Sequence, residues 1–250
     1  MVFPAFRFLT FLGRLECRRH IRGPYNMNSL PSLLASILSV AFVLPSRAAD
    51  LTVKVADKEP PKELGEAIRT VLQPRAVQVH DGNKPAFEFW FVKEVPLKTK
   101  PASLAKALDS LEQATLLGAV SVSADTRDYR NDELPAGVHT MRFALQPQDG
   151  DHSGSTDYTY FAVLVPAALD PQPGALTTYR AVVKASAKNT STGHPHVMSL
   201  RPASSEAADP PQIKEPAPEH KSLLLQLPAK AGEEKANLAF ELVFEGHVKK

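Results

Sequence analysis

A polar loop between residues 149 and 157 has the residue types and spacing that could bind a hard cation. It reads D-G-D-H-S-G-S-T-D, and oxygen-bearing side chains stand at loop positions one, three, five and nine: Asp149, Asp151, Ser153 and Asp157. Alternate side chains of such a loop point inward around Ca²⁺, and Gly154 at position six permits the sharp turn. Position twelve is Tyr160, where a bidentate carboxylate would complete the shell. The spacing predicts a Ca²⁺ site that lacks its last ligand, and a polar hairpin loop is the alternative.

Two histidines later in the chain form a second candidate metal site. His194 and His196 flank Pro195, and Met198 follows two residues further on. In an extended segment, side chains at i, i+2 and i+4 project from one face. Imidazole and thioether ligands suit copper, or zinc if a carboxylate joins them. The structural alternative places the histidines at the exposed end of a strand and Met198 in the core.

His152 lies beside Ser153 with several acids nearby, so a hydrolase that uses His152 with a distant acid is a further hypothesis. The string Gly150–Gly154 does not match the G-x-S-x-G turn that exposes a serine nucleophile. The sequence also contains no phosphate-binding loop, no dinucleotide fingerprint and no zinc-protease motif. We therefore favour a protein that is not an enzyme.

The N-terminal region has the features of an export signal. Leu30–Leu44 is an apolar run of 15 residues, and small residues follow at Ser46 and Ala48. Such a run is shorter than the roughly 20 residues that a membrane-spanning helix needs, and it is typical of a cleaved signal peptide. We expect residues 27–48 to be the signal peptide, residues 1–26 to lie upstream of the true start, and the protein to be periplasmic or extracellular. An uncleaved signal anchor is the alternative.

Cleavage would change the charge of the chain. The whole sequence has 29 Lys and Arg, 27 Asp and Glu and a net charge of +2, but residues 1–48 hold six arginines and one acid, which leaves −3 for residues 49–250. The basic character therefore belongs to the leader, and we expect no nucleic-acid partner. The one cysteine, Cys17, also lies in the leader, so residues 49–250 have no disulfide and no thiol nucleophile. We expect no stable membrane insertion after cleavage.

Short alternating apolar segments predict a mainly β protein. Strands are predicted at 51–55, 76–80, 86–92, 115–123, 137–145, 158–165, 197–200, 222–227 and 238–244. Helical spacing predicts short helices at 62–72 and 102–113, and 176–186 favours helix. Residues 202–219 contain five prolines among small and charged residues, which predicts a polar connecting loop. We predict one domain over 49–250, an antiparallel β-sandwich or partly closed barrel with two or three short helices.

Several strings in the middle of the chain resemble a family of exported bacterial proteins of unknown function. They are Asp128–Arg130, Leu134–Arg142 with its L-P-A-G-V-H-T, Leu145–His152 with its Q-P-Q-D-G-D-H, and Phe161–Pro166. The resemblance implies export and a β-rich fold, and it supplies no activity, cofactor or catalytic residue. His139 stands where the family motif would have tyrosine.

Export, a β-rich pattern and the absence of catalytic motifs in the sequence together favour a non-catalytic β-sandwich protein. We expect its partner to be an envelope protein or a carbohydrate. The alternatives are a module that binds Ca²⁺ at the 149–157 loop or copper or zinc at the histidine pair, and the hydrolase.

Overall fold

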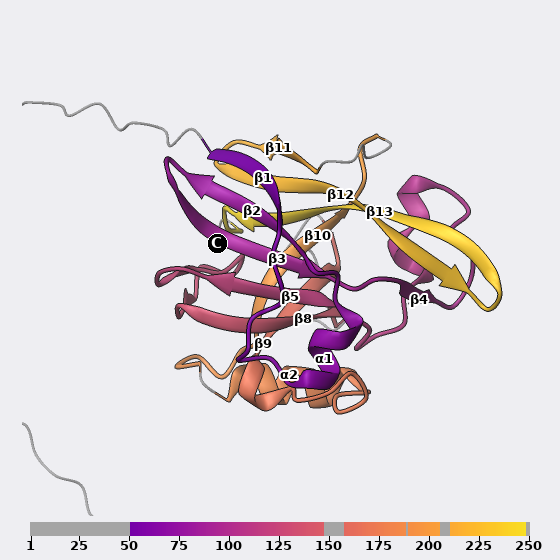
Figure 1. The fold of residues 1–250 in the computed structure, drawn as a ribbon, viewed down its shortest axis with the longest axis horizontal. Coiled ribbons are helices and arrows are strands. Elements are labelled where there is room, and N and C mark those ends of the chain that lie inside the picture. Colours follow the sequence, from indigo (N-terminus) through magenta and orange to yellow (C-terminus); the bar gives the residue numbers. More distant parts are fainter. Residues whose placement is uncertain (1–50, 148–157, 189, 206–210, 249–250) are drawn as a thin grey trace, which may run out of the picture. The chain divides into compact units, whose positions relative to one another are not determined.

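The alternating segments form the strands of one large curled sheet in the computed structural model of the protein (Figure 1). The structure describes residues 51–147, 158–188, 190–205 and 211–248. The strands are β1 Leu51–Asp57, β2 Arg75–Asp81, β3 Lys84–Phe91, β4 Val95–Leu97, β5 Leu116–Val122, β6 Thr126–Arg127, β7 Glu133–Leu134, β8 Gly137–Leu145, β9 Tyr160–Pro166, β10 His196–Pro202, β11 Gln212–Ala217, β12 His220–Ala231 and β13 Glu234–Glu245. The predicted mainly β class is confirmed.

Helical structure in the described residues is short. The two α-helices are α1 Glu66–Val71 and α2 Tyr179–Ala187, and 3₁₀ turns lie at Leu104–Lys106, Leu108–Ser110 and Ala167–Leu169. The helix predicted at 102–113 is instead a pair of 3₁₀ turns. Leu108 and Leu111 are both buried there, and a spacing of three residues places side chains on one side of a 3₁₀ turn as well as of an α-helix.

The main sheet has eleven strands in the described part of the chain. Ten follow the order β1-β2-β3-β5-β8-β9-β10-β13-β12-β11 with antiparallel neighbours, while β4 pairs in parallel with β12. Strands β6 and β7 form a separate small pair. The sheet is therefore mixed, and the prediction of a purely antiparallel arrangement is corrected at β4.

The sheet curls so that strands far apart in its order face each other across the core. The rings of Phe87 on β3 and Phe244 on β13 lie 5.7 Å apart, although their strands are not neighbours in the sheet. The two terminal strands of the order, β1 and β11, also contact each other, as Figure 1 shows. The sequence predicted a sandwich or a partly closed barrel. In the structure, one curled sheet encloses the core.

Strand β11 lies inside the segment for which composition predicts a loop. It is the last strand of the sheet order, and its register with β12 is irregular between Lys214 and Ala217, where Pro216 stands. Proline is tolerated at edges and irregularities because no ladder hydrogen bond needs its missing N–H. This edge position explains how a proline-containing segment forms a strand here.

Helix α2 covers the outer face of β9, so this strand is buried on both faces. Ala162 and Leu164 belong to the main core, whereas Val163 and Val165 pack in a second cluster with Val182 of α2. The continuous apolar run of β9 is the expected pattern for a strand covered on both sides. The Ser186 hydroxyl of α2 donates to the Leu164 carbonyl at 2.6 Å and accepts from the His196 N–H at 3.0 Å, which fastens the helix to two strands.

Gly118 on β5 has no space for a side chain. A Cβ at this position would lie 2.3 Å from the Trp90 carbonyl oxygen and 3.0 Å from the Phe91 Cα, and both are backbone atoms that cannot turn aside. We predict that Gly118→Ala lowers the free energy of unfolding by about 1–3 kcal/mol through overpacking. Urea unfolding monitored by Trp90 fluorescence measures the loss.

Gly174→Ala is the matched control, because no atom lies within 4 Å of its added Cβ. That variant should change the free energy of unfolding by less than about 0.5 kcal/mol. Equal stability of the two variants would contradict the close approach of β3 and β5.

Candidate functional site

A fully buried ion pair joins β8 to the segment that follows β9. Arg142 is 1% exposed and Asp170 is 0% exposed. The guanidinium Nε donates to Asp170 Oδ2 at 2.7 Å and Nη2 donates to Oδ1 at 2.8 Å, so the pair is bidentate. Thr140, two residues earlier on β8, donates its hydroxyl to the same Oδ2 at 2.6 Å. Bidentate pairs between arginine and carboxylate are among the strongest and most directional polar contacts.

The remaining guanidinium N–H groups donate to backbone carbonyls. Their acceptors, with distances, are Ala114 at 2.9 Å, Leu176 at 3.0 Å, Pro173 at 3.0 Å and Gln172 at 3.2 Å. Three of these carbonyls belong to residues 170–176, which we call the clamped loop. Because every donor nitrogen of Arg142 is engaged, this side chain fixes the clamped loop against β8 and has no N–H left for a substrate.

We call Arg142, Asp170 and the four carbonyls that accept from Arg142 the clamp. Two further backbone features lie next to it. A Cβ on Gly65, which precedes α1, would lie 2.1 Å from the Pro171 carbonyl oxygen, so α1 begins directly against the clamped loop. Ala114 holds a φ of 70°, a left-handed conformation that costs an L-residue about 1–2 kcal/mol. Its N–H donates to the Phe143 carbonyl at 2.8 Å and its own carbonyl accepts from Arg142. The clamp therefore stabilises an unfavourable backbone conformation.

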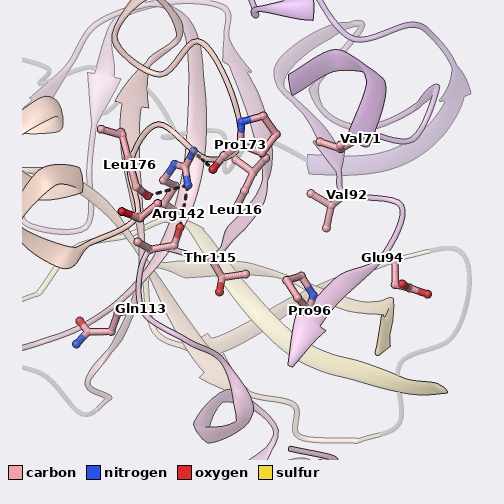
Figure 2. Close-up of a pocket in the computed structure, with 12 residues that line it drawn as sticks. Val71, Val92, Glu94, Pro96, Gln113, Thr115, Leu116, Arg142, Pro173 and Leu176 are labelled. Carbon is pink, nitrogen blue, oxygen red and sulfur yellow. Dashed lines mark hydrogen bonds between the residues drawn. The ribbon is translucent and has the colours of Figure 1, made fainter. Parts of the chain in front are cut away.

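A hollow of about 360 Å³ opens beside the clamp, and we call it the first hollow. Figure 2 shows Arg142 and Leu176 at one end, Val71 and Val92 across from them, and Glu94 with its carboxylate directed away from Arg142. Pro96, Leu116 and Pro173 add further apolar surface. The first hollow is thus a mainly apolar depression whose one buried cation is already neutralised.

A second hollow of about 1,070 Å³ follows the exposed side of α2. Its apolar lining includes Leu169, Tyr179 and Val183, and Leu176 lines both hollows. Leu176 of the clamped loop is therefore a wall residue of both hollows.

Three cations stand in a row along the second hollow. Arg180, Lys184 and Lys188 are exposed and line it at intervals of four residues. The described residues provide none of the three with an ion pair or a hydrogen bond. Four residues of α-helix rise about 6 Å, so the charges lie one above another on one side of α2. This row is a local group of positive charges without a partner among the described residues.

The described groups with a shifted pKa lie away from the two hollows. They are Asp109, His139, Tyr160 and Glu245, and none of these four lines the first or second hollow. Acid–base catalysis uses groups with adapted pKa values inside a cleft. What the two hollows offer is apolar contact beside a row of positive charge.

A buried Asp–His cluster lies on the inner face of the sheet. Asp128 Oδ2 accepts from the Val197 N–H at 3.0 Å, and the Nδ1 of His196 lies 3.7 Å from the same oxygen, beyond hydrogen-bonding distance. Asp128 Oδ1 accepts from the N–H groups of Arg130 and Asp132, each at 2.9 Å, which shapes the turn between β6 and β7. Burial, followed by the neighbouring charge of His196, lowers the pKa of His139 from 6.5 to about 4, and the Gly137 backbone partly offsets this.

The structure separates the residues of the predicted copper or zinc site. His194 is exposed and precedes β10, whereas His196 is 2% exposed and Met198 is buried within β10. Within the described ranges, no group of three or more His, Cys, Asp or Glu lies close enough to hold a metal ion.

The predicted Ca²⁺ ligands Asp149, Asp151, Ser153 and Asp157, and also His152, lie outside the described residues. Tyr160, at position twelve of that loop, donates its hydroxyl to Asp109 Oδ1 at 2.6 Å. Burial and this bond raise the pKa of Tyr160 to about 12. The Ca²⁺ site and the hydrolase hypothesis stay predictions.

Comparison with protein-family models, with curated proteins and with solved structures finds no match for this chain. The resemblance to exported proteins of unknown function therefore stays a prediction, as does the signal peptide, which lies outside the described residues. No helix in the described part of the chain is long and apolar enough to cross a membrane.

The residues of the clamp were not among the sequence candidates. One signal was available: Arg142 stands between Met141 and Phe143 in a predicted strand, where a charge needs a buried partner. Asp170 lies 28 residues away in an irregular segment, and no periodicity connects the two.

We predict that Asp170→Ala lowers the free energy of unfolding by about 3–5 kcal/mol, because it leaves a buried guanidinium without its counter-charge. The double variant Arg142→Met/Asp170→Ala should stay destabilised, since four carbonyls lose their donor. Lys100→Ala is the control: its ion pair with Glu234 is exposed, and such pairs contribute at most about 1 kcal/mol. Chemical denaturation measures all three, and a loss at Asp170 no larger than at Lys100 would contradict the clamp.

The buried His139 should make stability depend on pH. Its folded pKa of about 4 lies below the ordinary 6.5, so the unfolded chain binds more protons between these values. The stabilisation is therefore complete above about pH 6.5 and is lost as the pH falls toward 4, by at most about 3 kcal/mol. Urea unfolding at pH 7, 6, 5 and 4.5 tests this slope. His139→Gln should flatten the dependence of the unfolding free energy on pH, whereas His194→Gln, at an exposed position, should leave it unchanged. An unchanged slope in His139→Gln would refute the assignment of this pH dependence to His139.

Proposed function

We propose that the protein is an exported, non-catalytic binding protein that holds an acidic segment of an envelope protein across the first and second hollows. The observation that carries the proposal is the row of three cations along the second hollow, none of which has an ion pair among the described residues, next to the apolar first hollow. Residues 49–250 have a net charge of −3, so this row is not a consequence of general basicity. A local positive surface on a net acidic protein favours a partner that presents carboxylates.

The apolar lining supports a polypeptide partner in particular. Carboxylates spaced along a partner helix or strand would meet Arg180, Lys184 and Lys188, while its apolar side chains would enter the hollows on either side of Leu176. The large apolar side chains exposed in the described residues are Val71, at 36%, and Leu104. Neither lies on α2, and Val71 lines the first hollow. Apolar side chains that line a hollow favour an inserted segment over a membrane surface.

The clamp would make such binding less costly. A wall that is already ordered loses little conformational entropy when a partner docks, so more of the contact energy contributes to affinity. Arg142 supplies this order, and its own donors do not take part in recognition.

The test places a photo-crosslinking residue at Thr177, which lines the first hollow, and irradiates the protein with an envelope fraction of its host. We predict one or a few discrete protein adducts. Arg180→Glu/Lys184→Glu should reduce their yield about tenfold or more, because reversal turns two attractions into repulsions. Lys235→Glu, an exposed charge on the β12–β13 hairpin, is the matched control and should leave the adducts unchanged.

Rising salt should also weaken the adducts, since exposed charges are screened over about 10 Å at 0.1 M. Leu176→Ala should weaken them without changing their salt dependence. Adducts that survive the double reversal would contradict the proposal. Equal binding of any polyanion, with no effect of Leu176→Ala, would contradict a polypeptide ligand.

A further inference from the structure

A further buried carboxylate, besides Asp128 and Asp170, lies on the outer face of the C-terminal strands. Glu241 of β13 is 4% exposed, and its register partner Leu224 packs with Ala203 and Ala239 in a small cluster separate from the main core. The Ser204 hydroxyl donates to Glu241 Oε1 at 2.7 Å, and the Ser222 hydroxyl donates to Oε2 at 3.0 Å. This carboxylate is therefore held in place by two neutral donors.

Glu241 keeps unused acceptor capacity. An ionised carboxylate can accept about four hydrogen bonds, and the two hydroxyls supply two. No lysine or arginine in the described residues forms an ion pair with it, and the guanidinium of its cross-strand neighbour Arg201 lies over the Tyr158 ring at 4.7 Å. A nearly buried carboxylate without a counter-ion needs further polar contacts, and the two serines alone do not supply them.

Glu241 lines a hollow of about 450 Å³, the third hollow. The other lining residues are Tyr158, Arg201, Pro202, Ala203, Ser204, Lys214, Glu215 and Pro216. Two acids and two bases therefore face it, and Glu215 is itself paired with Lys221 at 3.0 Å. The balance of charge disfavours an ionic ligand of either sign and favours a neutral ligand rich in hydroxyl groups.

We propose that the third hollow binds one ring of a neutral sugar. The free lone pairs of Glu241 would accept two ring hydroxyls, Arg201 and Lys214 would donate to ring oxygens, and Tyr158 with the two prolines would contact the C–H face of the ring. A hollow of this volume lies within the usual size range of small-molecule sites, about 300–1,000 Å³. The site is separate from the surface around Arg142, so it does not depend on the partner proposed there.

Saturation-transfer NMR of the purified protein with glucose, galactose, mannose and N-acetylglucosamine, each at millimolar concentration, tests the site. At least one sugar should receive magnetisation. Glu241→Gln should weaken its binding about tenfold or more, because a charge-assisted hydrogen bond is replaced by a neutral one. Glu245→Gln, four residues further along β13 and outside the hollow, should bind as the unaltered protein does.

Circular dichroism of both variants checks that they are folded. Three results would each overturn the proposal. The first is no transfer to any of the four sugars, and the second is equal binding by Glu241→Gln. The third is that millimolar ammonium or Ca²⁺ displaces the bound sugar while a second sugar does not. The crosslinking outcome at Thr177 is independent of all three.

Discussion

Burying a guanidinium is the constraint on which the outer layer of this protein depends. A charged group removed from water is tolerated only when its charge and all its N–H groups are paired. Arg142 meets this requirement by using both oxygens of Asp170 and four backbone carbonyls. The partners come from Ala114, two residues before β5, and from the clamped loop, so satisfying one side chain fixes two segments that have no regular structure of their own.

That arrangement divides the molecule into parts with different roles. The inner face of the curled sheet is apolar apart from the Asp128 and histidine cluster, whose contacts hold the turn after β6 against β10. The outer face carries α2, the clamp and the carboxylate of Glu241. Exposed hollows occur where this outer layer is incomplete, and the proposed partner and sugar sites therefore lie outside the core. Substitutions there can alter binding with little loss of stability, except at the clamp itself.

Most of the sheet was predictable because each of the predicted strands carries a period-two pattern or a continuous apolar run. The strand predicted at 137–145 coincides with β8, and the preference for helix at 176–186 agrees with α2. Strand β11 was missed because an edge strand needs only half of its backbone paired and tolerates Pro216. The parallel pairing of β4 was missed because three residues carry no periodicity.

The candidate surface was less predictable than the fold. The spacing of Arg180, Lys184 and Lys188 is visible once a helix is assumed, but the sequence does not show that no acid among the described residues pairs with them. The sequence offered two readings for His194, His196 and Met198: one shared face or a strand entry with Met198 in the core. His194 is exposed before β10 and Met198 is buried, as the second reading has it, but His196 is buried as well and does not lie at an exposed end. Arg142 and Asp170 meet only through the fold, so their relation could not be read from spacing.

The most direct test of this account is the NMR behaviour of the Arg142 guanidinium protons. If every N–H is hydrogen-bonded in a buried site, rotation and solvent exchange are both restrained. The account predicts separate, slowly exchanging Nε and Nη proton signals for Arg142, in contrast to the exposed Arg180, whose Nη signals should be averaged and exchange rapidly. Averaged, rapidly exchanging signals from Arg142 would show that the loop is not clamped and would contradict the account.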